Sequence, residues 1–336
     1  MNISFQPYSL HLKQPLITGN GKFSLRSGWI VRSYMREKCF YSEIAPLPGF
    51  SKESQQDVFQ WISKNDIHIK KNLNNLDWIH EIPFASIRFG LDAIRLQLLA
   101  AADGKSLHHY LNESALNQVK INGLISLLDP IQADAQLEKF IQSGINHVKV
   151  KVGIKPSQEL NLIRILRKKY PQLIWRIDAN QAFSAEDAVH FLNDLKNEPI
   201  DYCEQPVDFS NTEALKFVKD NSVIAIAADE SAYSLDNILH LIEQDAADVF
   251  VIKPMLIGSI QEIQAITDLI KQRGKKLVFT SSLETVVGRR ITAQIAAAFT
   301  QDPEIPNGLS TGYLFDSDLD YFTEKIENGF FYLNQD

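Results

Sequence analysis

The chain of 336 residues is poor in cysteine, in long apolar runs and in net positive charge, and each shortage excludes a class of protein. Its two cysteines, Cys39 and Cys203, are too few for a disulfide framework, so we expect a reducing compartment. No apolar run reaches the roughly 18 residues that a membrane-spanning helix needs, so we expect no membrane partner. The 34 Lys and Arg against 41 Asp and Glu give a formal net charge of −7, which argues against a nucleic-acid partner.

The N-terminal sequence also lacks the basic and then apolar pattern of a secretory signal peptide. Hydrophobic residues make up 45% and charged residues 22%, which are ordinary values for a globular protein. We therefore expect a cytoplasmic protein with a large core. The length suggests two domains, or one barrel with an attachment. Nothing in the sequence sets an oligomeric state.

The N-terminal third combines strand and helix patterns. Segments 3–5 and 29–31 carry β-formers and are bounded by glycines such as Gly28. Residues 52–79 have a polar, mostly helical pattern, and apolar residues recur at helical spacing through 85–102.

From residue 118 onward, short apolar runs alternate with amphipathic helical stretches. The predicted strands are 121–128, 146–152, 173–178, 200–204, 223–229, 248–253 and 276–281, with a weaker one near Leu309. The predicted helices are 156–169, 184–196, 212–220, 235–244 and 259–273. This alternation indicates βαβ units and a parallel sheet, and eight such units favour a closed barrel over an open sheet.

Polar or charged residues close most of these strands at their C-terminal ends. They are Lys149 with Lys151, Asp178 with Asn180, Glu204, Asp229 with Glu230, Lys253, and Ser281 with Ser282. In a barrel these strand ends build the active site. A solvated charge is the simpler interpretation for any one of them, but six in succession favour a shared site. Cys203 precedes Glu204 on its strand, so it should point to the opposite face and pack.

Three neighbouring strands end in the carboxylates Asp178, Glu204 and Asp229. Carboxylates that converge on one point repel each other unless a cation lies between them. Oxygen ligands without His or Cys favour Mg²⁺, or Mn²⁺, over Zn²⁺. The alternative is a carboxylate cluster paired with the flanking lysines.

Lys149 and Lys151 lie two residues apart on a strand and so point to the same face. Like charge and burial both depress a lysine pKa, which predicts a neutral basic amine near neutral pH; the alternative is that both side chains reach water. Lys253 ends the sixth strand, across the barrel. A base, an opposing cation and a metal between them suit proton abstraction next to a carboxylate, with the enediolate stabilised by the metal and Lys253.

These residues resemble the motifs of the enolase superfamily, in its muconate-lactonising subgroup. The matching pieces are Lys149-Val150-Lys151, Asp178-Ala179-Asn180, Glu204-Gln205-Pro206, Asp229-Glu230-Ser231 and Lys253-Pro254. The resemblance implies an α/β fold, namely a (β/α)7β TIM-like barrel with an N-terminal α+β capping domain. It would place the cap at 1–115, the barrel at 116–314, and residues 315–336 as a return that completes the cap.

The same resemblance assigns roles to the site residues. It implies Mg²⁺ held by Asp178, Glu204 and Asp229. It also implies Lys151 as the general base, Lys149 as its electrostatic neighbour, and Lys253 as the second lysine on the opposite side.

Further segments are similar to the o-succinylbenzoate synthase family, which are dehydratases of menaquinone biosynthesis. These segments are 43–51, 83–90 and 281–284 with Gly288. The similarity implies a small-molecule carboxylate substrate and the dehydration of 2-succinyl-6-hydroxy-2,4-cyclohexadiene-1-carboxylate to o-succinylbenzoate.

The expected substrate contacts come from three regions. The family places the strand-seven loop around the substrate carboxylates, and the hydroxyls of Ser281 and Ser282 suit an anion, although turn formation also explains them. Asn180 joins these contacts, as do Lys22 and Arg26 from a loop over the barrel mouth, although both cations could equally be solvated.

Two alternatives stay open. The first is an N-acylamino-acid racemase or a dipeptide epimerase of the same superfamily, since Lys151 and Lys253 could supply bases on both faces. Dipeptide epimerases often carry an acidic DxD motif that holds the substrate amine, and Asp316 and Asp318 have this spacing. The second is a non-catalytic binding barrel, against which the complete set of lysines and carboxylates argues.

Overall fold

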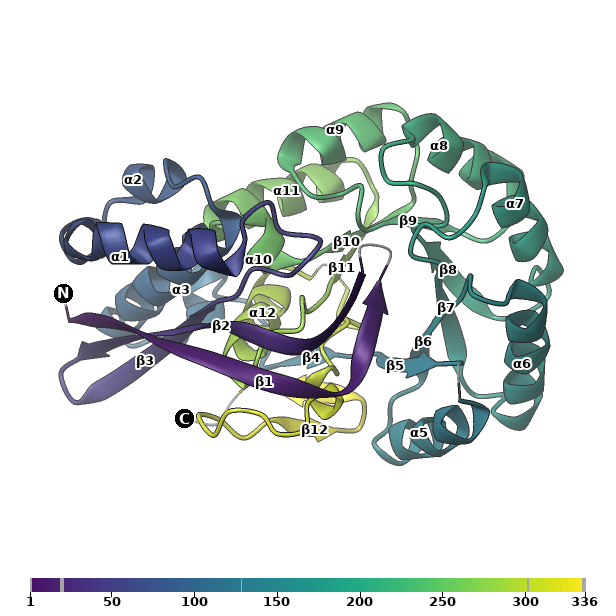
Figure 1. The fold of residues 1–336 in the computed structure, drawn as a ribbon, viewed down its shortest axis with the longest axis horizontal. Coiled ribbons are helices and arrows are strands. Elements are labelled where there is room, and N and C mark those ends of the chain that lie inside the picture. The colour runs from purple at the N-terminus through teal and green to yellow at the C-terminus, as the bar shows by residue number, and fades with distance from the viewer. Residues whose placement is uncertain (1, 19–20, 128, 301, 334–336) are drawn as a thin grey trace.

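The structure, a computed structural model, describes residues 2–18, 21–127, 129–300 and 302–333, although the side chains of residues 16–18 and 21–22 are not described. An antiparallel sheet opens the chain, formed by β1 (Ile3–Thr18), β2 (Gly21–Met35) and β3 (Lys38–Ile44). The helices that follow are α1 (Gln55–Asn72), α2 (Leu76–His80), α3 (Ala85–Ala102) and α4 (Leu107–Leu111). Together they form a cap beside the barrel, and the long β1–β2 hairpin extends from the cap toward the barrel strands (Figure 1).

The cap is held together by apolar faces of α1 and α3 that pack on the sheet. Its buried residues include Val31, Ile44, Val58, Ile62, Ile87, Leu91, Ile94 and Leu98. Gly90 lets α3 approach the sheet, because a Cβ there would lie 2.3 Å from Cγ1 of Ile44. The prediction that Gly28 bounds a strand is wrong: Gly28 lies inside β2, where a Cβ would lie 2.6 Å from the carbonyl oxygen of Ile44.

The barrel strands pair in sequence order in one parallel sheet. They are β5 (Gly123–Ser126), β6 (His147–Lys151), β7 (Ile174–Asp178), β8 (Ile200–Glu204), β9 (Ile226–Ala228), β10 (Val249–Ile252) and β11 (Lys276–Phe279). Parallel bridges from Ile121 to Asn307 and from Thr280 to Gly308 join the two edges of this sheet. The closed parallel barrel is thus confirmed, and the strand expected near Leu309 is reduced to these bridges.

Helices surround the barrel between successive strands. They are α5 (Pro130–Gln142), α6 (Pro156–Lys169), α7 (Ala185–Asp194), α8 (Thr212–Asn221), α9 (Leu235–Glu243), α10 (Pro254–Ile257), α11 (Ile260–Gln272) and α12 (Val286–Phe299). Several begin at a residue whose side chain accepts from the first turn, such as Ser184, Asn211 and Ser259. Such caps satisfy backbone N–H groups that have no partner within the helix.

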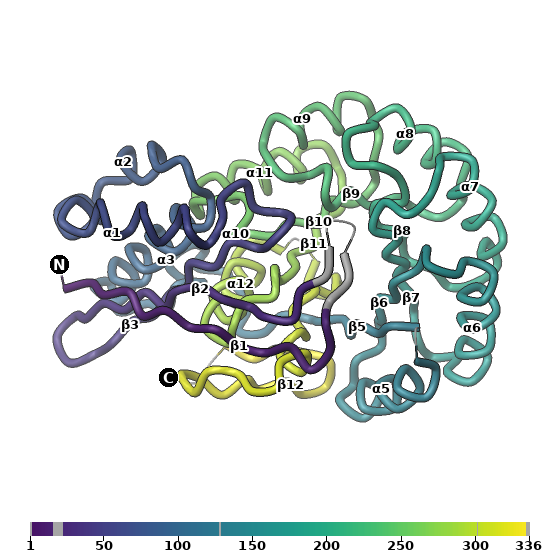
Figure 2. The backbone as a smooth tube through the Cα atoms, in the orientation of Figure 1, coloured from purple at the N-terminus to yellow at the C-terminus, as the bar shows by residue number. Residues whose placement is uncertain are grey.

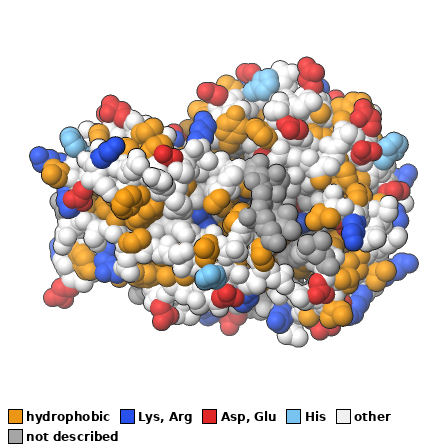
Figure 3. Space-filling view, in the orientation of Figure 1, with side chains coloured by type: hydrophobic (Ala, Val, Ile, Leu, Met, Phe, Trp, Pro, Cys, Tyr) orange, Lys and Arg blue, Asp and Glu red, His pale blue; other side chains and the backbone are white. Residues whose placement is uncertain are grey.

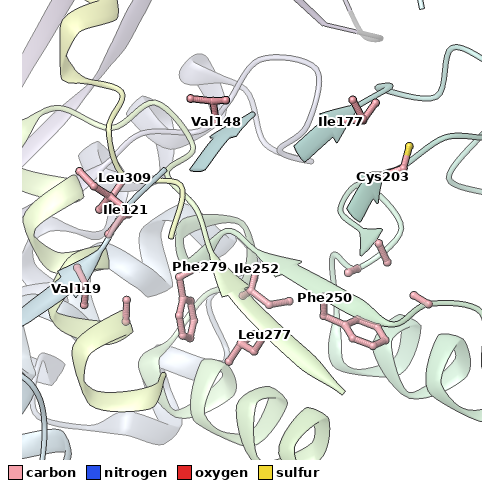
Figure 4. Close-up of a cluster of buried hydrophobic side chains, with 14 of the residues drawn as sticks. Val119, Ile121, Val148, Ile177, Cys203, Phe250, Ile252, Leu277, Phe279 and Leu309 are labelled. Carbon is pink, nitrogen blue, oxygen red and sulfur yellow. The ribbon is translucent and has the colours of Figure 1, made fainter. Parts of the chain in front are cut away.

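Alternate residues of the barrel strands face the helices and the barrel interior. Val148, Ile177, Cys203 and Phe250 belong to the outer apolar cluster (Figure 4). Cys203 therefore packs away from Glu204, as predicted. Inside the barrel a smaller apolar cluster is formed by Tyr202, Ala227, Val249, Val251 and Val278.

The last described segment contacts first the cap and then the barrel. Leu12 of β1 bridges Phe315, and Tyr321 and Phe322 pack near Ile30 of β2. Next, β12 (Lys325–Glu327) and β13 (Phe330–Tyr332) pair with β4 (Gln118–Lys120), which precedes the first barrel strand. In Figure 2 the yellow C-terminal part of the chain passes the purple β1, and the bridge between Leu12 and Phe315 is where the two meet.

No helix among the described residues is long and apolar enough to cross a membrane. Acidic and basic side chains are intermixed on the face shown in Figure 3.

Candidate active site

The predicted lysines and carboxylates meet because their strands pair in register. Lys151 of β6 lies opposite Asp178 of β7, and Asp178 lies opposite Glu204 of β8. Residues in register on parallel strands point to the same face of a sheet, so these three side chains share the barrel interior. Asp229 and Lys253 directly follow β9 and β10 at the same end.

Ion pairs join these groups across the barrel. Nζ of Lys149 donates to Oε1 of Glu204 at 2.7 Å and lies 3.1 Å from Oδ2 of Asp178. Nζ of Lys151 lies 3.9 Å from the same Asp178 oxygen. On the opposite side Lys253 pairs with Asp229. The arrangement places a lysine on each side of a row of buried carboxylates.

The carboxylates change the protonation that was expected of the lysines. Burial lowers the pKa of Lys149, but Asp178, Glu204 and Asp229 together outweigh it and raise the pKa well above its usual value. Asp229 and Glu230 likewise overcome burial and raise the pKa of Lys253. The prediction of a depressed pKa is therefore wrong for Lys149, because it counted the second lysine and burial but omitted three nearby negative charges.

The three carboxylates do not form a closed cation site in this structure. In their present conformations, no three His, Cys, Asp or Glu side chains of the described residues stand close enough together to hold a metal ion. Asp178 and Glu204 turn toward Lys149, and Asp229 turns toward Lys253. The donor set nevertheless fits a hard cation, because the buried Oε2 of Glu204 has no hydrogen-bond partner among the described residues.

Burial also acts on the carboxylates themselves. Burial raises the pKa of Glu204 to about 8; Lys149 opposes this rise, whereas Asp178 and Asp229 add to it. Lys149 therefore does not offset the full cost of ionising the buried Glu204. A divalent cation beside this carboxylate would favour its ionised form.

Asn180 links the Lys151 side of the site to the far side. Its Oδ1 accepts from Nζ of Lys151 at 2.6 Å, and its Nδ2 donates to Oε1 of Glu230 at 3.2 Å. Asn180 also lines the cavity that Lys149, Lys151 and Lys253 face, called the catalytic cavity below, where a substrate contact was expected of it. Its carboxamide thus orients the Lys151 ammonium in addition to facing the cavity.

The strand-seven serines line the cavity, but their hydroxyl groups are directed elsewhere. Ser281 and Ser282 each donate to the buried carboxylate of Glu284, both at 2.6 Å. The oxygen of Ser281 also accepts from the N–H of Leu283 at 2.9 Å and from the hydroxyl of Thr311 at 3.1 Å, so its donor and both its lone pairs are used. Ser281 and Ser282 thus lie where a substrate contact was expected, and that contact stays a prediction; sequence spacing alone did not show that Glu284 turns back to them.

Arg26 is also not a substrate contact. Its side chain is fully buried and donates to the carbonyl oxygens of Ala45 and Pro46 in the cap and of Leu283 in the strand-seven loop, at 2.6 to 2.8 Å. It therefore joins the cap to the barrel. The predicted contact from Lys22 lies outside the described side chains.

Two adjoining cavities lie at this end of the barrel. A cavity of about 80 Å³ is lined by Lys149, Lys151, Asp178, Asn180, Asp229 and Lys253, with Phe23, Leu47 and Phe50 from the cap. A larger cavity of about 690 Å³ lies between the cap and the barrel. The two share Phe50, Asp229 and Lys253, and Nζ of Lys253 lies 5.6 Å from the centre of the Phe50 ring.

Nothing in the sequence indicated the roles of two residues, Phe23 in the cavity wall and Gln205 beside Glu204. Phe23 lies within the segment expected to close over the substrate, but its apolar side chain carried no chemical signal. Gln205 stands in the Glu-Gln-Pro motif, yet only the structure shows what its carboxamide binds.

Asp316 and Asp318, which have the spacing of the epimerase motif, lie away from the two cavities. Oδ2 of Asp318 lies 2.6 Å from Nη2 of the buried Arg289, and its Oδ1 accepts from the N–H of Val286. Asp316 is exposed, and neither aspartate lines the two cavities.

Known families match both parts of the chain. Residues 132–336 match the family described as enolase C-terminal domain-like. Residues 2–98 match the MenC N-terminal domain.

The similar proteins and solved structures carry the names of two kinds of enzyme. The o-succinylbenzoate synthase of Vibrio cholerae serotype O1 (strain M66-2) is 30% identical over 93% of this chain and 90% of that protein. The L-amino acid-D/L-Glu epimerase of Sulfurimonas denitrificans is also 30% identical, but over 64% of this chain and 63% of that protein, which is less than two thirds of its length. The structure of a dipeptide epimerase from Enterococcus faecalis V583, complexed with Mg and a dipeptide, superposes with a TM-score of 0.89 at 23% identity, covering 99% of this chain and 96% of that one.

Proposed function

Because this chain belongs to the enolase superfamily, we propose that it is an o-succinylbenzoate synthase. It would dehydrate 2-succinyl-6-hydroxy-2,4-cyclohexadiene-1-carboxylate to o-succinylbenzoate, as a carbon–oxygen lyase of menaquinone biosynthesis. The observation that carries this choice is the extent of similarity: the synthase relative matches cap and barrel over 93% of the chain, whereas the epimerase relatives match 64% and 54% of it.

The position of Asp318 supports the same choice. An epimerase that holds a dipeptide amine needs a free carboxylate at the cavity, because an ammonium group is held by negative charge. Asp318 is committed to Arg289 and does not line the cavity. The pocket wall near the last strand instead carries Ser310 and Thr311, which suit a neutral or anionic group better than an ammonium group.

A magnesium ion would be held by Asp178, Glu204 and Asp229. When bound, it would act as a Lewis acid that stabilises negative charge on the substrate carboxylate. Its charge would also offset the carboxylates that now keep Lys149 and Lys253 protonated.

The lysines would carry the proton chemistry. Lys151, oriented by Asn180, removes the proton α to the ring carboxylate, and the electron pair of that C–H bond passes into an enediolate. Lys253 approaches from the opposite side and stabilises the negative charge. The C–O bond of the 6-hydroxyl then breaks, and the Lys151 ammonium returns the proton to the leaving hydroxide as water. Aromatisation of the ring favours this second step.

The assay follows product formation. The purified protein should convert the cyclohexadiene substrate with Mg²⁺, seen as growing aromatic absorbance, and should lose this activity on chelation. Lys151→Ala should also lose it, whereas Lys155→Ala, a cation in the loop beyond the same strand, should retain it. Near-normal dehydration by Lys151→Ala in the presence of Mg²⁺ would refute the proposed base.

A further inference from the structure

Gln205 is buried at the centre of the carboxylate-bearing loops. It directly follows Glu204, and its side chain is 0% exposed. Its backbone φ is +38°, a left-handed conformation that costs energy for a residue with a side chain. A residue other than glycine keeps this conformation only when its contacts stabilise it. The contacts of Gln205 therefore indicate its role.

The carboxamide of Gln205 is fully used. Its Oε1 accepts from the N–H of Asp229 at 3.1 Å, the N–H of Ser231 at 3.2 Å and the hydroxyl of Ser231 at 2.9 Å. Its Nε2 donates to the carbonyl of Val207 at 3.1 Å. One acceptor oxygen thus fixes the turn that carries Asp229.

The Gln205 backbone fixes the neighbouring loop as well. Its carbonyl accepts from the N–H of Gln181 at 2.7 Å, three residues beyond Asp178, and its own N–H donates to Ala227 at 2.9 Å. Residue 205 therefore contacts the loops after β7 and β9 while it adjoins Glu204. Each of these loops adjoins one proposed cation ligand: Asp178 ends β7, and Asp229 directly follows β9.

We infer that Gln205 is a positioning residue, which sets the separation of Asp178, Glu204 and Asp229 and so the affinity of the site for a divalent cation. The inference rests on the cation part of the proposed function. The side chain at this position must accept hydrogen bonds from Asp229 and Ser231 and donate one to Val207. A carboxamide does both. Leucine lacks both, and glutamate lacks the donor.

The test measures cation binding without substrate. Binding of MgCl₂ to the full-length protein is followed by calorimetry, and binding of Mn²⁺ by electron paramagnetic resonance. Gln205→Leu should raise the dissociation constant for both ions about 10–100-fold, the usual effect of removing a group that orients metal ligands. The substitution keeps an unbranched Cβ at the left-handed position, so it alters the carboxamide rather than the backbone requirement.

The matched control is Gln294→Leu, which removes a carboxamide of α12 that is 9% exposed, contacts His108 and lies outside the catalytic cavity. It should lose thermal stability but keep the cation affinity of the unmodified chain. If Gln205→Leu does not fold, Ser231→Ala takes its place, because it removes one of the three groups that Oε1 holds and should weaken cation binding severalfold.

Two results would overturn the inference, and they are distinguishable. In the first, Gln205→Leu, or Ser231→Ala where that variant is needed, binds the cation as tightly as the unmodified chain does. This result would show that the carboxamide does not position the ligands, and it would leave the proposed function intact. If the unmodified chain itself binds neither Mg²⁺ nor Mn²⁺, the cation part of the proposed function fails together with the inference.

Discussion

Replacing Arg26 by methionine should separate the cap from the strand-seven loop. Methionine keeps much of the apolar length but removes every donor. The guanidinium now donates to Leu283 at 2.8 Å, Pro46 at 2.7 Å and Ala45 at 2.6 Å, and all these contacts are buried. In the variant, these buried carbonyl groups lose their charged donor at once.

The expected magnitude follows from those contacts. A hydrogen bond to a charged group contributes about 1.5–3 kcal/mol, but bonds that share one side chain do not add fully. Arg26 also offsets the buried carboxylate of Glu43, whose pKa burial raises and Arg26 lowers. Because three buried bonds to one charged group are lost together without adding fully, we expect the free energy of unfolding to fall by about 3–5 kcal/mol.

Urea unfolding followed by circular dichroism measures this loss. Arg164→Met is the control, because Arg164 is 40% exposed on α6 and bonds only at the surface. It should change the free energy of unfolding by less than about 0.5 kcal/mol. A loss below about 1 kcal/mol in Arg26→Met would refute the view that this residue joins cap and barrel.

Other predictions address catalysis and pH. Lys151→Ala should lower kcat for dehydration about 10²–10⁴-fold, as expected for loss of a general base, and Lys253→Ala about 10²–10³-fold, both read from aromatic absorbance. Asp318→Asn should lower the melting temperature, because the buried Arg289 loses a charged partner, yet leave kcat for dehydration unchanged; a collapse of kcat would instead place Asp318 in the site. Burial, aided by Arg176, lowers the pKa of His147 to about 4. Between pH 6.5 and 4, the unfolded chain therefore binds more protons at this histidine than the folded chain does. The contribution of the neutral His147 to the free energy of unfolding is present above pH 6.5 and is lost as the pH falls toward 4. Because His147 is partly exposed, the free energy of unfolding should fall by about 1–2 kcal/mol over this pH range. In urea unfolding, His147→Gln should lose less stability between pH 7 and 5 than the unmodified chain does. Equal losses in the two proteins would contradict the assignment to His147.

Much of the barrel could be predicted because its signals are local. The helix 156–169 and the strand 200–204 have the bounds expected from periodicity. The convergence of Lys151, Asp178 and Glu204 also followed from the sequence, since residues at equivalent strand ends must meet when the strands pair in register.

The contacts made across long sequence distances could not be predicted. Arg26 resembles a cationic substrate ligand until the structure shows that the carbonyl of Leu283, 257 residues away, accepts a hydrogen bond from its guanidinium. Gly28 resembles a turn glycine, but the close approach of Ile44 in the next strand is what requires it. The pKa of Lys149 rises rather than falls because charges on three other strands outweigh its burial.

The central claim is that this site eliminates water from a cyclohexadiene carboxylate rather than inverting an amino-acid centre. One preparation with Mg²⁺ should be given the cyclohexadiene substrate, an N-acylamino acid and L-Ala-L-Glu in D₂O, with kcat/KM measured for each by absorbance and proton resonance. We predict the highest kcat/KM for dehydration. Faster deuterium exchange at the α-carbon of the dipeptide or the N-acylamino acid, with little aromatic product, would contradict the claim.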